Sequence, residues 1–186
     1  DIGPGCSDLA SKIISNSQKL NQNLILIDSS EMLDQLEDVK GITKLPARFP
    51  ICQDFLNNFQ NKVDVIICYS VFHYIFSEGN IFNFLDSALS LLSPGGQMLI
   101  GDIPNISKRK RFFSSNKGIE FHKEFTKSDS DPIVNHLKIE HDEIDDAVIF
   151  SILQRARIQG FDSYLLPQNK NLYMANRRED ILIINN

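Results

Sequence analysis

The sequence has no tryptophan, only three cysteines, and no apolar run long enough to span a membrane. The cysteines (Cys6, Cys52 and Cys68) are odd in number and lack the spacing of metal ligands. This pattern excludes a disulfide framework and is typical of reduced thiols in a cytosolic setting. We therefore expect a cytoplasmic protein without a membrane span.

Positive charge is also in short supply. Nineteen Lys and Arg stand against 24 Asp and Glu, and the net charge of −5 argues against a general nucleic-acid binder. His136 and His141 lie among acidic residues, but their five-residue spacing in a polar stretch is poor metal-ligand geometry. We expect neither a nucleic-acid partner nor a metal.

The composition that remains is that of a globular domain. The 186 residues are 42% apolar and 23% charged, which suits one domain, 1–186, with a core of its own. Apolar runs predict strands, and helical spacing separates them. The expected strands are 24–28, 51–55, 63–69, 97–101, 164–166 and 181–184, and the expected helices are 7–20, 81–92 and 142–159, with a brief helix after 55. This alternation predicts an α/β fold with a mostly parallel sheet.

A glycine turn opens the chain. In Asp1-Ile2-Gly3-Pro4-Gly5-Cys6-Ser7-Asp8, two glycines precede a predicted helix, whose N-terminus offers free N–H groups to a ligand. A nucleotide-like cofactor is the expected ligand. A dinucleotide fingerprint needs a third small residue where Asp8 stands, which counts against NAD or a flavin.

An acid ends the predicted strand 24–28. Asp28 lies 23 residues after Gly5 (28 − 5 = 23), the position at which a carboxylate binds a ribose diol. Asp28 is alternatively a cap for the helix that begins at Ser29. In that helix, Met32, Leu33 and Leu36 are expected on the inner face.

Together these motifs resemble class I S-adenosylmethionine-dependent methyltransferases. The Asp-x-Gly-x-Gly turn, Asp28, Gln53-Asp54, "IICYSVFHYI" and "LLSPGGQMLIGD" occur in that family's order, and the last two are the most specific. The resemblance implies a Rossmann-like, doubly wound sheet with an antiparallel final strand. In that fold an apolar strand precedes the glycine turn. Because no such run and no Met precede Asp1, we expect the sequence to be a fragment that lacks the first strand.

The resemblance also implies a binding site for S-adenosylmethionine. Asp1 would lie near the methionine amino group, with Gly3 and Gly5 passing beneath it. Asp28 would accept hydrogen bonds from both ribose hydroxyls, since a carboxylate offers two acceptor oxygens.

Further residues would enclose the base and the sulfonium. Ser29 and Met32 would lie near the adenine, Asp54 would accept from its amino group, and Phe55 would lie close to the ring. Asp54 is equally an N-cap. Cys68, Tyr69 and Ser70 would line the sulfonium side, although Cys68 is also typical of a small buried apolar residue.

The acceptor side is predicted less directly. A proton must be removed only if the acceptor is a hydroxyl or a protonated amine. His73 follows the fourth strand, where substrate approaches, and its pKa range suits a base. The alternative is that His73 packs between helix and sheet, with His122 as the reserve candidate. Asp102, at the end of the fifth strand, is expected on the substrate side.

Residues 104–141 lie outside the resemblance and lack clear periodicity, which predicts a lid over the substrate. Residues 105–127 hold seven Lys or Arg against two acids, among four phenylalanines. Arg109 and Arg111 are the candidates for binding an anionic acceptor. In the alternative, the phenylalanines anchor the segment and the bases pair with the acids of 128–146.

The sequence thus predicts an enzyme that methylates a small-molecule or sugar-like acceptor. Two alternatives remain. The first is a non-catalytic or regulatory domain that binds S-adenosylmethionine, and the second is a nucleotide-dependent oxidoreductase, which the missing third glycine disfavours.

Overall fold

The computed structural model describes all 186 residues and contains two β-sheets. In the smaller sheet, β1 (Leu24–Asp28) and β2 (Ile42–Pro46) run parallel. The larger sheet has the order β3-β4-β6-β5, in which β3 and β4 are parallel and β6 is antiparallel to both its neighbours. Its strands are β3 (Val63–Tyr69), β4 (Leu92–Pro104), β5 (Asp162–Pro167) and β6 (Arg178–Ile184). The mostly parallel arrangement with an antiparallel final strand confirms the predicted fold class.

Residues 1–3 join the two sheets. The Ile2 N–H donates to the carbonyl of Ile67 in β3 at 2.8 Å, and the Gly3 N–H donates to the carbonyl of Ile27 in β1 at 2.8 Å. Ile2 also forms a parallel bridge with Ile27. These three residues therefore occupy the position between β1 and β3 at which the first strand is expected.

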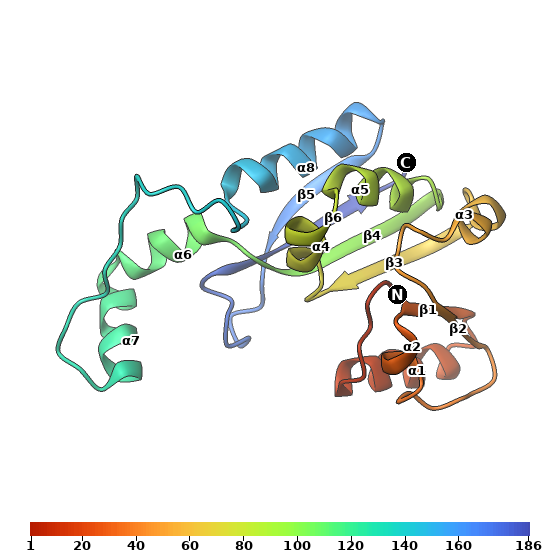
Figure 1. Ribbon diagram of the computed structural model, residues 1–186, viewed down its shortest axis with the longest axis horizontal. Coiled ribbons are helices and arrows are strands. Elements are labelled where there is room, and N and C mark those ends of the chain that lie inside the picture. The colour runs from red at the N-terminus through yellow and green to blue at the C-terminus, as the bar shows by residue number, and fades with distance from the viewer.

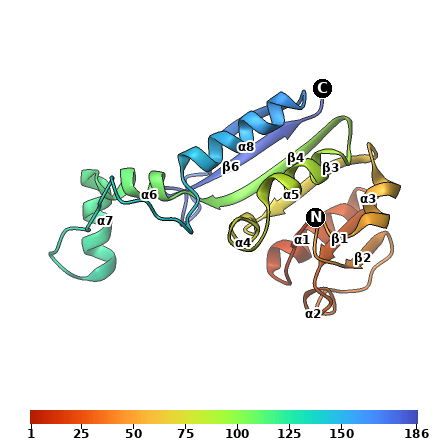
Figure 2. The ribbon, with the colours of Figure 1, turned by 45° about the horizontal axis from the view of Figure 1, so that its top comes forward.

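The chain has eight helices (Figures 1 and 2). They are α1 (Asp8–Lys19), α2 (Ser30–Leu33), α3 (Gln53–Phe59), α4 (Phe72–Glu78), α5 (Ile81–Leu89), α6 (Ile106–Phe113), α7 (Asn116–Thr126) and α8 (Asp146–Ile158). Figure 1 shows α5 and α8 side by side on one face of the larger sheet. None of these helices is long and apolar enough to cross a membrane.

Two apolar cores hold the layers together. The larger one has 22 buried residues, among them Phe72 and Phe84, and it reaches Ile27 and Phe49 beside the smaller sheet. Phe49 meets Phe84 edge to face, with ring centroids 5.3 Å apart. The smaller core has five buried residues, under α1 and α2: Ala10, Ile14, Leu26, Leu33 and Leu36.

The prediction of a strand at residues 51–55 was wrong. The strand that precedes α3 is β2, which lies earlier in the chain, and residues 51–55 lie before and within α3. β2 is an edge strand, so Thr43 and Lys44 are tolerated in it and no continuous apolar run marks it in the sequence. The predicted helix 81–92 ends earlier, at Leu89, because Leu92 already begins β4. The short helix α4 was not predicted.

The segment 104–141 is also more regular than predicted. It contains α6 and α7, and we call these two helices, residues 106–126, the arm. Both begin at a side-chain cap: Asn105 accepts from the Lys108 N–H, and Ser115 accepts from the Gly118 N–H. Figures 1 and 2 show the arm extending beyond the end of β4, at the opposite end of the molecule from α1.

Candidate functional site

A hollow opens at the carboxyl ends of β1, β2 and β3, the edge at which open α/β sheets bind ligands. It has two lobes that share Gly3, Asp28, Val71 and Tyr74. The wide lobe, of about 540 Å³, also contacts the chain after β2 and the end of α4. The narrow lobe, of about 370 Å³, also contacts the glycine turn, Met32 and the end of β3. Both volumes lie in the range of small-molecule sites.

The glycine turn forms the floor of the hollow. Gly3 and Gly5 have φ angles of +69° and +59°, which side chains rarely adopt. A Cβ on Gly3 would lie 2.6 Å from Cγ2 of Val71, so the turn packs directly on the chain that follows β3. A Cβ on Gly5 would meet nothing within 4 Å. Gly3 is therefore required for packing as well as conformation, and Gly5 for conformation alone.

Asp28 stands at the junction of both lobes. One carboxylate oxygen accepts from the Gly5 N–H at 2.9 Å, and the other accepts from the Ser29 N–H at 2.7 Å. The cap of α2 is instead Ser29, whose hydroxyl accepts from the Met32 N–H. The capping alternative for Asp28 is therefore wrong. Its carboxylate is held at the mouth of the hollow, and each oxygen retains a lone pair for a ligand.

Ser29 lines the wide lobe and Met32 the narrow one. Leu33 and Leu36 are buried as expected, but Met32 is 40% exposed. The placement of Met32 on the inner face of its helix was therefore wrong, because α2 is a single turn whose opposite side faces the hollow. Its thioether is available to an apolar ring.

Of the three residues predicted at the end of β3, Tyr69 and Ser70 line the narrow lobe. Cys68 lines neither lobe, because its side chain is completely buried in the larger core. This burial raises the pKa of the Cys68 thiol to about 12. Cys68 therefore packs as an apolar residue, in agreement with the alternative given from the sequence.

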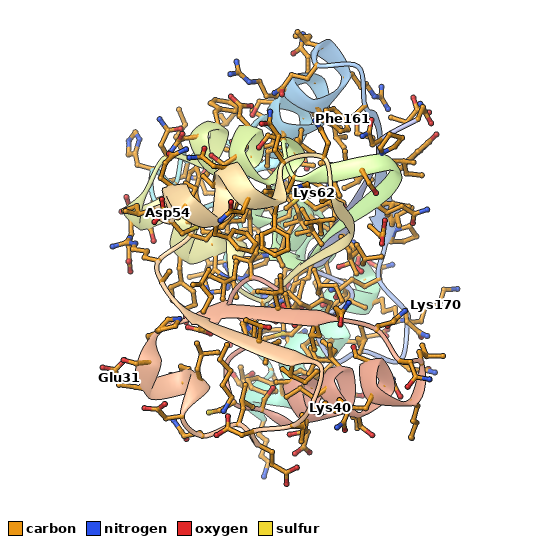
Figure 3. All side chains as sticks on the ribbon, turned by 90° about the vertical axis from the view of Figure 1, so that its right-hand side faces the viewer. Glu31, Lys40, Asp54, Lys62, Phe161 and Lys170 are labelled. Carbon is orange, nitrogen blue, oxygen red and sulfur yellow. The ribbon has the colours of Figure 1, made fainter.

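Asp54 and Phe55 are not brought to the hollow. Both lie in the first turn of α3, where Asp54 is exposed and Phe55 stacks on Phe59 at 4.7 Å. Figure 3 shows Asp54 on α3 at the outer edge of the molecule. Asp1 also lines neither lobe, although its carbonyl accepts from the Ile27 N–H.

The residues that follow β2 are Ala47, Arg48 and Phe49, and all three line the wide lobe. Sequence reasoning missed them because β2 was placed too late in the chain. The Ala47 N–H donates to the Asp28 carbonyl at 3.0 Å, so this segment runs beside the mouth. Arg48 reaches across the lobe to Glu78 at the end of α4, with nitrogen and oxygen 3.3 Å apart.

A polar network lies beside the narrow lobe, where β3, β4 and β6 end or begin. The Asp102 carboxylate accepts from the Ser70 hydroxyl, the Arg178 guanidinium and the Gln168 amide. Ser70 and Asp102 have φ angles of +61° and +60°, a costly conformation for residues with side chains. Asp180 accepts from the Asp102 N–H at 2.8 Å and so holds this backbone in place. Asp102 thus does not line the hollow itself, but it contacts Ser70, which does.

His73 is the second residue of α4, just beyond this network. Its Nδ1 is buried without a hydrogen-bond partner, and its ring packs on Tyr74 at 4.0 Å. Burial and then the Arg178 charge lower the pKa of His73, and Asp102 and Glu143 oppose them. The imidazole is therefore neutral at pH 7. His73 does not itself line the hollow, whereas its neighbour Tyr74 lines both lobes.

The other acceptor-side candidates belong to the arm. His122 and Arg109 line a separate pocket of about 260 Å³ between α6, α7 and residues 132–140. Arg111 is paired with Asp146 at the start of α8, through two guanidinium nitrogens. The structure thus separates Arg109 and Arg111, and it brings neither of them, nor His122, to the hollow.

The sequence matches no family model, and it has no significant match among curated proteins. The structure, in contrast, is similar to solved methyltransferases over its whole length. The plantazolicin methyltransferase BpumL in complex with a triazolic desmethylPZN analog and SAH has a TM-score of 0.62 at 15% identity, covering 100% of this chain and 75% of that one. The methyltransferase domain of bacterial CtHen1 has a TM-score of 0.65 at 12% identity, with 100% and 88% covered.

The carbon methyltransferase CurJ is a third similar structure. Its TM-score is 0.62 at 15% identity, covering 99% of this chain and 47% of that one. The three proteins share a fold with this chain at low identity. The chain therefore has the class I methyltransferase fold, as its motifs predicted.

Proposed function

We propose that the chain is an S-adenosylmethionine-dependent methyltransferase that acts on a small-molecule or sugar-like acceptor. The observation that carries this proposal is the hollow, in which the glycine turn and the Asp28 carboxylate are joined by the Gly5–Asp28 hydrogen bond. The fold supports it, since BpumL was solved with SAH, the product of the cofactor. The volume and the chemistry of the lining fit a nucleoside.

In this proposal, the narrow lobe holds the ribose and the amino-acid part of the cofactor. The free lone pairs of Asp28 accept from the two ribose hydroxyls, and Gly3 and Gly5 let the ligand approach the backbone. Asp1 binds the methionine amino group. Tyr69 and Ser70 face the sulfonium, and Cys68 supports them from the core.

The wide lobe holds the adenine. Ser29 contacts the base from the β1 side, and Met32 approaches it from the adjoining narrow lobe. We assign the adenine contacts that were expected from Asp54 and Phe55 to Arg48 and the adjacent Phe49, which follow β2. Arg48 is a donor, so it would recognise a ring nitrogen of adenine or stack on the base.

S-adenosylmethionine supplies a methyl group already activated on sulfur, which leaves alignment and proton removal to the protein. We assign removal of the acceptor's proton to His73, whose neutral imidazole has a buried Nδ1 without a partner. Asp102, paired with Arg178, holds the hydroxyl of Ser70, next to which the acceptor would lie. His122 stays the reserve candidate, because it lines the arm pocket and not the hollow.

Two measurements test the proposal. Calorimetric titration with SAH and with NAD should show binding of SAH alone, whereas a preference for NAD would point to an oxidoreductase. Incubation with S-adenosylmethionine and cell extract should then release SAH. Binding without any release of SAH would point to the non-catalytic alternative.

A further inference from the structure

Two arginines share one phenylalanine at the base of the arm. The guanidinium carbon of Arg109 lies 5.5 Å from the centroid of the Phe113 ring, and that of Arg177 lies 5.8 Å from it. Arg109 precedes Phe113 by one helical turn on α6, whereas Arg177 comes from the segment just before β6. Arg177 is held there because its carbonyl accepts from the Asn105 N–H at 3.0 Å.

The side chains of these two arginines have no oxygen partner. The other five of the seven in the chain each donate to an oxygen: Arg48 to Glu78, Arg111 to Asp146, Arg155 to Asp86, Arg157 to Ser163 and Arg178 to Asp102. The Arg177 guanidinium donates only to the sulfur of Met174, and the Arg109 guanidinium makes no hydrogen bond. Two guanidinium groups with unused donors on one ring are the chemistry that binds phosphate or carboxylate groups.

The surroundings leave this positive charge uncompensated. Lys110 belongs to the same arm pocket as Arg109, and the one acid that lines it, Glu140, is paired with Lys138 at 3.1 Å. Burial, and then the charges of Arg109 and Arg178, lower the pKa of Arg177, although nearby Tyr173 opposes them. An anion bound by both guanidinium groups would relieve this repulsion.

We propose that Arg109 and Arg177 form an anion clamp around Phe113 that binds a phosphate or carboxylate group of the methyl acceptor. The identity of the ligand as the acceptor rests on the proposed function, whereas the clamp itself does not. The clamp replaces the pair Arg109 and Arg111 expected from the sequence, because Arg111 is neutralised by Asp146. Contact with the aromatic ring does not use the guanidinium N–H groups, which except for the Arg177 Nε–H have no partner.

The test uses inorganic phosphate and acetate as probes, each compared with chloride at equal ionic strength. Thermal unfolding of the parent chain should show a stabilisation specific to one of the two anions, and the larger response identifies phosphate or carboxylate chemistry. Arg109→Gln and Arg177→Gln should each weaken the apparent affinity about tenfold or more. Lys117→Gln, which removes an exposed charge from α7, should respond like the parent.

Arg109 is exposed, so Arg109→Gln should fold normally, and Arg177→Lys keeps the charge if Arg177→Gln unfolds. Side-chain NMR provides a second readout, since the Nε–H signals of Arg109 and Arg177 should shift with the anion while that of Arg155 stays fixed. An equal response of all variants, or no response beyond chloride, would overturn the clamp. SAH titrations of the same variants keep the two proposals apart: a parent chain that ignores SAH but responds to phosphate refutes the methyltransferase and retains the clamp.

Discussion

The Asp28 carboxylate accepts a hydrogen bond from the Gly5 backbone N–H at 2.9 Å, across 23 residues of chain. This bond fixes the glycine turn relative to the end of β1, so one side chain both shapes the hollow and presents acceptor oxygens to it. A change at Asp28 therefore alters the wall and the ligand contacts together.

We predict that Asp28→Ala lowers the affinity for SAH by roughly one to two decades, because charged hydrogen bonds of this kind contribute about 1.5–3 kcal/mol. Asp28→Asn retains one acceptor oxygen, so its affinity for SAH should lie between that of Asp28→Ala and that of the parent. Glu37→Ala, an exposed acid near α2, is the matched control and should bind normally. Calorimetric titration measures all four chains, and equal affinities would remove Asp28 from the site.

The two glycines of the turn should differ in their tolerance of a methyl group. Gly3→Ala combines a positive φ with a contact of 2.6 Å to Val71, whereas Gly5→Ala has only the conformational cost of about 1–2 kcal/mol. Urea unfolding should therefore show a larger loss of unfolding free energy for Gly3→Ala. Adding Val71→Ala should recover part of that loss, and the absence of any recovery would contradict the packing argument.

The proposed base predicts a pH profile. His73 must be neutral to accept a proton, and its pKa is lowered below 6.5, so methyl transfer should be lost as the pH falls below 6.5. Because a depressed histidine pKa also means that protonation favours the unfolded chain, stability should fall in the same range.

Removing the Arg178 charge gives this prediction its control. Arg178→Gln removes a repulsion and frees Asp102, and both effects raise the pKa of His73, so the acidic limb should move to higher pH. His73→Gln should lose the limb altogether. If the profile of His73→Gln matches the parent's, another group removes the proton.

The attachment of the arm depends on a buried amide. Asn105 is 1% exposed, donates to Glu179 at 2.6 Å and to Asp146 at 2.8 Å, and caps α6. Asn105→Ala should cost about 1–3 kcal/mol because it leaves an oxygen of the buried Glu179 carboxylate without a donor. Limited proteolysis should then cleave within 106–126 sooner than in the parent. Ser115→Ala, which removes only the cap of α7, should have a smaller effect on unfolding.

Features encoded within a few residues could be predicted from the sequence. The glycine turn, Asp28 and the largely apolar β1 and β3 follow from local patterns, and the structure places them as expected. β2 was misplaced because its position at the sheet edge permits Thr43 and Lys44, which hide the strand. That error placed the expected adenine contacts on α3, away from the segment Ala47–Phe49 that lines the wide lobe.

The arm was missed for a different reason. Its phenylalanines pack on one another and beneath arginines, not against the main core, so they show no single apolar stripe. The caps Asn105 and Ser115 were visible signals that could have predicted both helices. The partnership of Arg177 with Phe113 could not be predicted, because it is formed between distant segments and requires the tertiary structure.

The small core of five residues under α1 and α2 has a consequence for how ligand binding and folding are coupled. With so little apolar area, the β1–β2 unit should open locally at a lower free energy than β4, which is buried in the main sheet. A ligand in the hollow contacts both units, so it must close this opening before it is fully bound. Amide hydrogen exchange in β1 should therefore slow with ligand much more than exchange in β4, and the measured affinity would include the free energy of that local folding.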